Sequence, residues 1–349
     1  MSSTPTSPPP HTSNARIPFS GATSTDSDTR PTDFILRSCE GVDFHVRKDM
    51  LRALSDFFDD MFSMVREGLD GEDLFFAGKT VLAVPESTKV LYALLSIAYP
   101  RQQPSLGSPE KGLGIDDILE IMEAAQKYQF VVAEPLIKNL LGASALIQQH
   151  PHRIFAIARL HQLPVHIVRE AALGTLRFSV TPLRLQFPEM DRISWSAAQR
   201  LFDFHQICGE RVHVRLARMD ERFEGGTHMV NNKQTQKRYI WWQRNDGEGN
   251  GFHPAVHNAS CGARAGQHGT GKSAPWFTAH LTKLLVKIRG SPAPSTILVE
   301  VVNVAPSERA LIMACGACKK FADEDLKNFA ERLAVKVRLI TEQVAEDYF

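Results

Sequence analysis

The sequence predicts an α+β fold, in which a short mixed sheet packed with helices precedes a mainly α-helical C-terminal region. Between Phe34 and Phe62 the apolar residues first alternate and then recur at steps of three and four. This change of period indicates a β-hairpin followed by a helix. Beyond residue 86 most apolar residues recur with helical spacing. A chain of 349 residues is long enough for about two or three domains.

Composition and charge favour a protein of the cytoplasm or nucleus. The formal net charge is +1, which gives no overall field to attract nucleic acid or acidic lipid. Five cysteines without a signal-like N-terminus indicate a reducing compartment. The longest apolar runs are much shorter than the roughly 18 residues of a membrane span. We therefore expect a soluble protein that contacts neither membrane nor nucleic acid directly.

The first element in chain order is a tail, residues 1–31, rich in Ser, Thr and Pro. It contains only two large apolar side chains close together, Ile17 and Phe19. So little apolar surface cannot offset the entropy lost on ordering, so we predict that the tail is disordered.

Residues 32–142 form the predicted N-terminal domain. Phe34 to Leu36 reads as a strand, a turn at Glu40-Gly41 follows, and Val42 to Val46 alternates as a second strand. The helical positions that follow are Met50, Leu51, Leu54, Phe57, Phe58, Met61 and Phe62. Further along, the predicted elements are a strand over 81–84 and helices over 88–99, 115–128 and 135–141. The hairpin and first helix cannot bury both of their faces alone, so they need these later helices or a partner chain.

Several motifs in this region resemble those of BTB/POZ domains. The matching segments are Asp33-Phe34-Ile35-Leu36, Phe44-His45-Val46-Arg47-Lys48 with Leu51, Ser55-Asp56-Phe57-Phe58 with Met61-Phe62, Glu86 with Leu91, and Ala125-x-Lys127-Tyr128. Arg47 stands where the family usually has His. The chain is most similar to the expanded BTB family of mushroom-forming fungi.

The resemblance implies a non-enzymatic interaction protein. Such a domain would form a homodimer, or associate with other BTB proteins, through its first helix and an exposed strand edge. The candidate interface residues are Phe34, Leu51, Leu54, Phe57, Phe58 and Met61, some of which must face the domain's own core. The implied role is that of an adaptor, either recruiting substrates to a ubiquitin ligase or acting with transcription factors, and the sequence does not choose between them.

Two further sets of residues correspond to family positions. Asp33 and Lys48 match positions that line a charged groove in some dimeric BTB proteins, and they also suit a strand end and a helix start. Val65 and Glu67 resemble the apolar-x-Glu segment through which some BTB adaptors contact a cullin, although they lie closer to Met61 than that segment usually does.

The rest of the chain divides into three predicted segments. Residues 143–223 read as a helical extension, residues 224–275 as an irregular Gly-, Asn- and His-rich segment, and residues 276–349 as a helical region with a C-x-x-C motif. The final helix is predicted from Asp323 to about Glu346. No zinc-finger array, Kelch repeat or ankyrin repeat identifies a partner.

The cysteines of this region suggest a metal site. Cys315-Gly-Ala-Cys318 has the spacing that lets two thiolates share one tetrahedral Zn²⁺. Two pairs offer the remaining ligands, His205-x-x-Cys208 and His257-x-x-x-Cys261, and we take Cys208, Cys261, Cys315 and Cys318 as the candidates for a structural zinc. The alternative is that these are free cysteines acting as small apolar side chains.

A second motif suggests a nucleotide site. Residues 266–273, GQHGTGKS, satisfy the phosphate-loop pattern, and a helix is plausible after Ser273. The buried strand that must precede such a loop is missing, because residues 261–265 read CGARA. We therefore interpret the motif as a Gly-rich loop. A nucleotide-binding enzyme remains the alternative, but no catalytic set of side chains supports it, and we expect no enzyme activity and no cofactor other than zinc.

Overall fold

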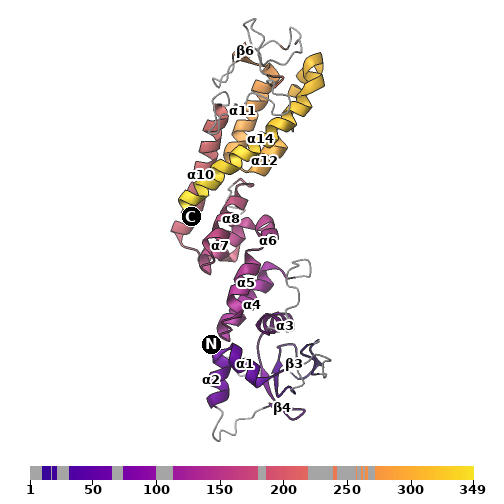
Figure 1. The fold of residues 1–349 in the computed structure, drawn as a ribbon, viewed down its shortest axis with the longest axis vertical. Helices are drawn as coiled ribbons and strands as arrows, with labels where there is room; N and C mark the ends of the chain where they lie inside the picture. Colours follow the sequence, from indigo (N-terminus) through magenta and orange to yellow (C-terminus); the bar gives the residue numbers. More distant parts are fainter. Residues whose placement is uncertain are drawn as a thin grey trace. The chain divides into compact units, whose positions relative to one another are not determined.

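The computed structural model describes residues 10–16, 18–21, 31–64, 74–99, 113–179, 186–218, 239–241, 257, 261, 264–265 and 272–349. The chain forms two compact units, residues 1–146 and residues 147–349, which we call unit 1 and unit 2. Figure 1 shows the order of their elements. Unit 1 contains a small mixed sheet and helices, and the elements described in unit 2 are almost all helical, so the α+β expectation is confirmed.

Unit 1 is built on a five-stranded sheet with the order β1-β3-β2-β5-β4. Its strands are β1 (Ser13–Asn14), β2 (Phe34–Arg37), β3 (Val42–Val46), β4 (Leu74–Phe76) and β5 (Lys79–Ala83). The predicted hairpin is confirmed, because β2 and β3 pair antiparallel with Phe34 opposite Val46. The central strand β2 also pairs with β5, in parallel.

The alternation of side chains gives the sheet two faces. Phe34 and Leu36 share one face with Phe44, and all three side chains are buried in the core of unit 1. Arg37 and Asp43 lie opposite one another on the second face, and both are also buried. A buried ion pair on this face implies that further chain covers it.

The predicted helix between Met50 and Phe62 is two helices, α1 (Lys48–Leu54) and α2 (Asp56–Met64). The break is at Ser55, whose backbone is extended at φ −150° and ψ 117°. Its hydroxyl accepts from the Phe58 backbone N–H at 3.1 Å and donates to the Tyr128 carbonyl at 2.5 Å. Ser55 therefore caps α2 and ties it to a later part of the unit, which the apolar period could not reveal.

The remaining helices of the N-terminal part agree with the predicted positions within a few residues. They are α3 (Thr88–Ala98), α4 (Ile115–Lys127) and α5 (Ala133–Leu141), and a further helix that was not predicted, α6 (Ser144–Gln149), follows them. Ser87 caps α3 by accepting from the Val90 backbone N–H. The buried apolar positions of α3 and α4 complete the core that the hairpin and first helices leave open.

The prediction of a disordered tail is wrong for residues 10–16 and 18–21. Strand β1 pairs in parallel with β3, and Ala15 and Phe19 are buried. The Phe19 ring packs edge-on against Tyr92 and Tyr99, with ring centroids 5.8 Å and 5.5 Å apart. One buried aromatic side chain and a few strand hydrogen bonds are enough to hold a segment whose composition is typical of disorder.

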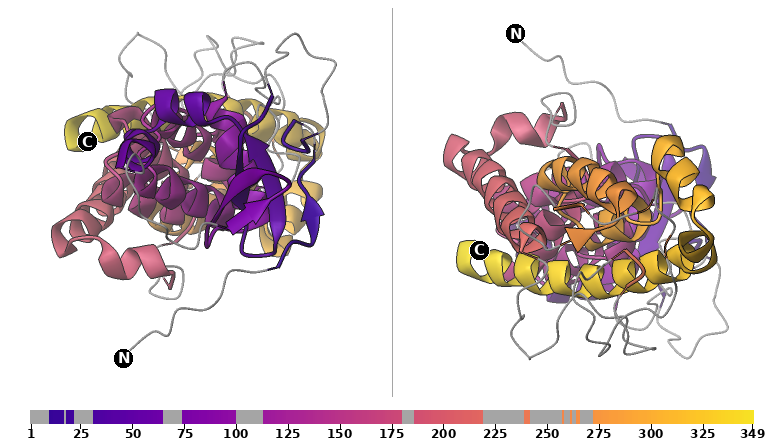
Figure 2. Two further views of the ribbon diagram at one scale, coloured as in Figure 1. Left: turned by 90° about the horizontal axis from the view of Figure 1, so that it is seen from below. Right: turned by 90° about the horizontal axis from the view of Figure 1, so that it is seen from above.

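Unit 2 joins two segments that the sequence analysis separated, because both the helical extension and the C-terminal helices belong to it. Its helices are α7 (Pro151–Leu160), α8 (Val165–Thr175), α9 (Pro188–Arg192), α10 (Trp195–Ala217), α11 (Pro275–Gly290), α12 (Pro294–Glu300), α13 (Pro306–Ala314) and α14 (Gly316–Tyr348). Helix α14, yellow in Figure 2, packs against α8, α10, α12 and α13. It begins at Gly316 rather than at the predicted Asp323.

An aromatic cluster forms the centre of the unit 2 core. Trp241 stacks between Tyr239 and Phe277, with ring centroids 4.8 Å and 4.3 Å apart. The backbone of this short stretch is also paired, since Ile240 N–H donates to Asp325 at 2.7 Å and the Trp241 carbonyl accepts from Ala274 at 2.7 Å. Residues from the predicted irregular segment are thus fully buried between α11 and α14.

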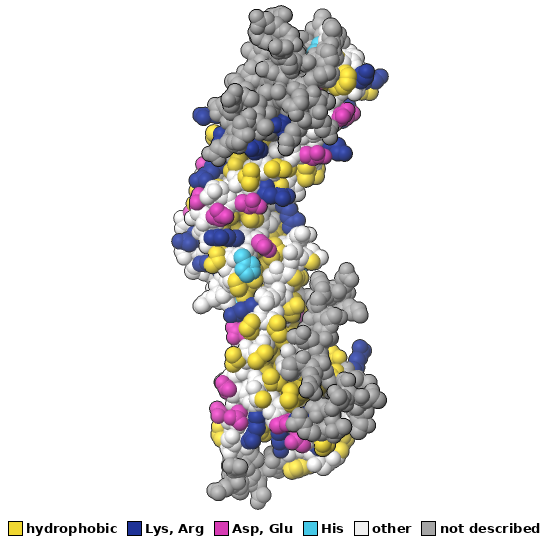
Figure 3. All heavy atoms as spheres, in the orientation of Figure 1, with side chains coloured by type: hydrophobic (Ala, Val, Ile, Leu, Met, Phe, Trp, Pro, Cys, Tyr) yellow, Lys and Arg dark blue, Asp and Glu magenta, His cyan; other side chains and the backbone are white. Residues whose placement is uncertain are grey.

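The surface is consistent with the small net charge. On the described part of the face in Figure 3, basic and acidic side chains intermingle. None of the helices that the structure describes is both long and apolar enough to cross a membrane.

Candidate metal centre

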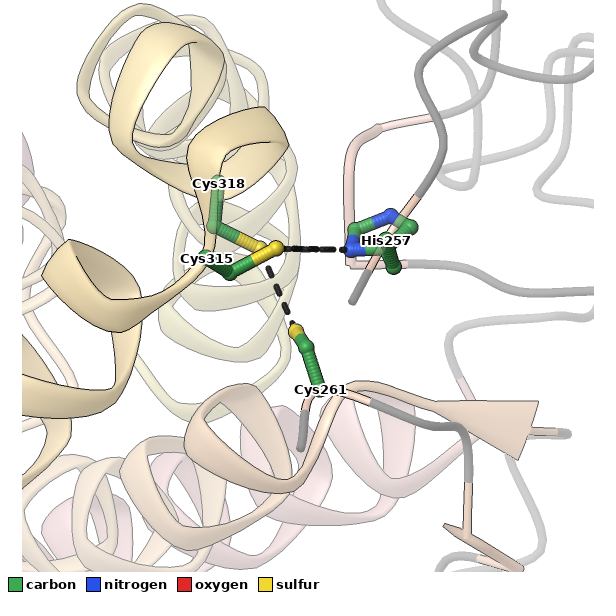
Figure 4. A group of neighbouring side chains, drawn as sticks. All are labelled: His257, Cys261, Cys315 and Cys318. Carbon is green, nitrogen blue, oxygen red and sulfur yellow. Dashed lines mark hydrogen bonds between the residues drawn. The ribbon is translucent and has the colours of Figure 1, made fainter. Parts of the chain in front are cut away.

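Four potential metal ligands meet in unit 2: His257, Cys261, Cys315 and Cys318. Their ligand atoms all lie within 4.8 Å of one another. The three cysteines are buried and His257 is half-buried. In Figure 4, Cys315 and Cys318 come from the start of one helix, and the side chains of Cys261 and His257 point toward them.

The separations of the ligand atoms suit one tetrahedral zinc ion. Zn–S bonds of about 2.3 Å and Zn–N bonds of about 2.0 Å place neighbouring ligands about 3.8 Å (S to S) and about 3.5 Å (S to N) apart. The Nδ1 atom of His257 lies 3.6 Å from Cys315 Sγ and 3.5 Å from Cys318 Sγ. The Sγ atoms of Cys261 and Cys318 are 3.4 Å apart. The group therefore needs only small shifts to accept a zinc ion.

The N-terminus of α14 positions two of the ligands. Cys315 is the N-cap, with an extended backbone, and Cys318 lies in the first turn. The unpaired backbone N–H groups and the positive end of the helix dipole favour negative charge here. These features offset part of the cost that burial places on a thiolate at the two positions.

Short contacts within this group shift the pKa values of three of its side chains. The pKa of the Cys261 thiol is lowered, first by its hydrogen bond with Cys318 and then by His257, while the pKa of Cys318 is raised by the same contact and by burial. The pKa of His257 is raised, chiefly by its hydrogen bond with Cys261. Trp276 also donates its ring N–H to Cys318 Sγ at 3.4 Å, which holds that sulfur in place.

Three of the four predicted cysteine ligands belong to this group, and Cys208 does not. Cys208 is buried in α10, where burial raises the pKa of its thiol to about 12, as expected for an apolar core cysteine. Its partner in the predicted pair, His205, instead lies 2.9 Å from the Thr175 hydroxyl. The fourth ligand is His257, from the second pair that the sequence offered, because residues 257 and 261 lie beside the start of α14.

The two described residues of the phosphate-loop motif, Lys272 and Ser273, lie in a strand and not in the first turn of a helix, where a nucleotide site would place them. Strand β6 (Arg264–Ala265) pairs antiparallel with β7 (Lys272–Ser273), so the motif's Lys and Ser lie in a hairpin. Helix α11 begins only at Pro275. Ser273 is buried, and its hydroxyl lies 2.7 Å from that of Thr278. Residues 266–271 lie outside the described part of the chain.

Of the predicted interface residues in unit 1, half are core residues. Phe34, Leu51 and Phe58 are 2% exposed or less, so they pack inside the unit and present no surface to a partner. Leu54 and Met61 are half-buried, and 36% of Phe57 is exposed. The helical period could not distinguish the two sets, since each face of these short helices carries apolar residues.

The predicted charged groove is a local contact between a strand end and a helix start. Asp33 accepts from the backbone N–H of Lys48 at 2.8 Å, at the first residue of α1. The Lys48 ammonium lies 5.6 Å from the ring centroids of Phe34 and Phe62. The other two candidates, Val65 and Glu67, lie outside the described residues.

Two features of unit 1 near Tyr128 were not predicted from the sequence. Val131 and Val132, between α4 and α5, are 66% and 55% exposed, which is unusual for aliphatic side chains beside a core. The Tyr128 hydroxyl donates a hydrogen bond to Glu86 at 2.6 Å.

No protein-family profile matches the chain, and no curated protein sequence matches it.

Proposed function

We propose that this chain is a non-enzymatic interaction protein, in which unit 1 is a BTB/POZ-type association module and unit 2 is stabilised by a structural zinc ion. The observation that carries the first part is that the motif residues of the resemblance, which are distant in sequence, pack together. Residues that merely matched a pattern by chance would have no reason to meet.

The contacts among these residues connect three motifs. Ser55 donates to the Tyr128 carbonyl, and the Phe58 ring stacks on Tyr128 with centroids 5.6 Å apart and planes 20° apart. The hydroxyl of Tyr128 and the ammonium of Lys127 both bind Glu86, at 2.6 Å and 2.8 Å. A single packing arrangement thus explains why Ser, Phe, Glu, Lys and Tyr stand at these positions, which supports the family proposal.

The exposed apolar side chains near Tyr128 are the proposed association surface. We call Phe57, Val131, Val132 and Leu136 the corner patch. The Phe57 ring lies 5.4 Å from the Tyr128 ring, and Val131 and Val132 are three and four positions after Tyr128 in the sequence. Leu136 is 37% exposed. Large apolar side chains left exposed near one another are typical of a protein–protein interface. We propose that a second copy of the chain, or another BTB protein, covers this patch.

Light scattering of the full chain tests the association. We expect twice the mass of one chain, and the mass of a single chain for the double variant Phe57→Asp, Val132→Asp. Trp195→Asp in unit 2 is a matched control, since Trp195 is 76% exposed and lies outside the patch. A single-chain mass at high concentration, or a double variant that still associates, would contradict the proposal.

The adaptor role has two candidate settings, and partner capture distinguishes them. Affinity purification of the full chain from its own cells should recover a cullin if the protein recruits ubiquitin-ligase substrates. Transcription factors or chromatin proteins in place of a cullin would favour the second setting. The double variant Phe57→Asp, Val132→Asp should lose the partners that bind unit 1 and retain those that bind unit 2.

The zinc ion in unit 2 is proposed as structural. The site offers four protein ligands, three of them buried cysteines, so that no coordination position is left for a substrate. When bound, zinc would join residues 257 and 261 to the start of α14. The long connection between α10 and α11 would then be held against the aromatic core at residues 257 and 261.

A further inference from the structure

The N-terminal segment of unit 1, residues 10–16 and 18–21, lies along β3, and we call it the strap. Its two-residue strand β1 pairs with β3, and further backbone hydrogen bonds flank this pairing: Thr12 N–H to the Gly41 carbonyl at 2.9 Å, Ala15 N–H to the Asp43 carbonyl at 2.8 Å, and the His45 N–H to the Phe19 carbonyl at 3.0 Å. This short pairing, local side-chain contacts and the buried Phe19 ring hold the described part of the strap. A small change in free energy at one contact can therefore open it.

Charged side chains of the second sheet face lie beneath the strap. Arg37 donates to both carboxylate oxygens of Asp43, at 2.6 Å and 3.0 Å. His11 of the strap lies with Nδ1 3.0 Å from Asp43 Oδ2, and its ring stacks on Phe76 with centroids 4.6 Å apart. The strap therefore contacts this polar face through His11, in addition to the apolar contacts of Phe19.

His45 is the side chain whose protonation state decides the strap contact. Its Nδ1 lies 3.3 Å from the Lys79 ammonium, and its Nε2 lies 3.3 Å from Asn14 Oδ1 in β1. An ammonium can only donate, so Nδ1 must accept, and the proton must be on Nε2, where it donates to Asn14. A neutral ring with its proton on Nε2 thus satisfies both contacts at once, whereas a protonated ring keeps its donor for Asn14 but loses its acceptor for Lys79.

The strap also leaves no room for the ring to turn away. His45 is 8% exposed. A Cβ atom built on Gly21 would lie 2.7 Å from the His45 ring, so a glycine at φ +73° lets the strap pass close to it. A second proton on His45 would put a donor against Lys79 and a buried positive charge beside another cation.

We propose that the strap is a pH-sensitive latch, closed on neutral His45 and released when His45 gains a proton. Once the strap opens, water solvates the imidazolium and the Lys79 ammonium separately, and the repulsion is relieved. Acidification therefore shifts the equilibrium toward the open strap, because only the open state binds the proton readily.

The charged groups around His45 set the direction of this response. Burial, Lys79 and His11 all lower the pKa of His45 in the closed state, and Asp43 raises it. The attraction of Asp43 is weakened because Arg37 holds both of its oxygens. Lys79 is itself fixed in place by donating to the Thr32 hydroxyl at 2.6 Å. Burial and the Lys79 ammonium therefore outweigh the attraction of the Asp43 carboxylate.

Hydrogen exchange of the full chain measures the strap directly. The exchange rate of the strap peptide is measured at pH 7.5 and pH 5.5. At each pH it is converted to a protection factor with the exchange rate of the free peptide at the same pH. A group that titrates near 6.5 in the open state changes the opening equilibrium by up to about tenfold over this range. We expect strap protection to fall by that factor while protection of β2 stays constant. Unchanged strap protection, or an equal loss in β2, would overturn the proposal.

Three variants assign the effect to His45. His45→Gln keeps a donor for Asn14 and an acceptor for Lys79 without titrating, so its strap protection should be the same at both pH values. Lys79→Gln removes the opposing cation, so the loss of strap protection between pH 7.5 and pH 5.5 should be smaller. If His45→Gln opens the strap at both pH values, the result for Lys79→Gln tests the proposal in its place. His11→Gln should retain the response. A response lost in His11→Gln but kept in His45→Gln and Lys79→Gln would show that the latch does not depend on His45.

Discussion

At the scale of single residues, Cys208 and Cys318 show how position decides the chemistry of one side-chain type. Both are fully buried, but Cys208 lies among apolar side chains of α10, whereas Cys318 has two other cysteines and a histidine around it. The sequence predicted Cys315 and Cys318 as a pair because the C-x-x-C spacing lets two thiolates share one tetrahedral zinc ion. It could not choose the second pair, since that depends on which chain segments the fold brings together.

This difference gives a metal-content prediction. Purified protein should contain about one zinc per chain, and Cys318→Ser should retain less than a tenth of that, because three ligands of a structural site hold zinc much more weakly than four. Cys208→Ser is the matched control and should keep its zinc. Mass-spectrometric metal analysis after dialysis measures both. Equal zinc in the two variants, or none in the unmodified chain, would exclude the proposed site.

His205 gives a pH prediction at the same scale. Burial lowers the pKa of His205 to about 4, below its ordinary value of 6.5, so folding favours the neutral ring. Its contribution is therefore constant above pH 6.5 and is lost as the pH falls from 6.5 toward 4, by about 2 kcal/mol at pH 5. Urea unfolding followed by tryptophan fluorescence should show this loss, and His205→Gln should show a smaller one. An equal acid response in both proteins would assign the loss to other groups.

At the scale of elements, apolar periodicity located most helices and strands of unit 1 but not their junctions. The hairpin of β2 and β3 and helices α3 and α4 were predicted because one apolar face determines each of them. The break at Ser55 was missed, since the apolar period continues across it and the deciding contacts are the hydroxyl's bonds to Phe58 and Tyr128. The strap was missed because a few long-range contacts override its composition.

The Ser55 cap can be tested by a single substitution. Ser55→Ala should reduce the free energy of unfolding of unit 1 by about 1–2 kcal/mol, because it removes a helix cap and leaves the Tyr128 carbonyl without its donor. Ser63→Ala, at an exposed position in the same helix α2, should change it by less than about 0.5 kcal/mol. Urea unfolding followed by hydrogen exchange of the β2 peptide compares them. Equal effects would mean that the cap is energetically unimportant.

At the scale of the whole molecule, the metal centre and the aromatic cluster belong to one core in unit 2. Cys261, Cys315 and Cys318 are members of the same buried cluster as Trp241 and Trp276. Sequence reasoning divided this region into three segments because the connection between α10 and α11 has the composition of a loop. Tyr239 and Trp241 show that part of this connection belongs to the core. Their burial depends on contacts with α14, which a local sequence pattern cannot reveal.

Because the site lies in only one of the two units, metal removal should destabilise them unequally. All four tryptophans are in unit 2, so their fluorescence reports its unfolding. A zinc chelator should lower the fluorescence midpoint by roughly 10 °C, as expected for the loss of several kcal/mol of binding free energy in a unit of this size. Exchange protection of β2 and β3 in unit 1 should stay unchanged, and added zinc should restore the midpoint. If both units lost stability together, the zinc would be supporting more than the core of unit 2; if neither did, the four side chains would be an ordinary set of buried thiols.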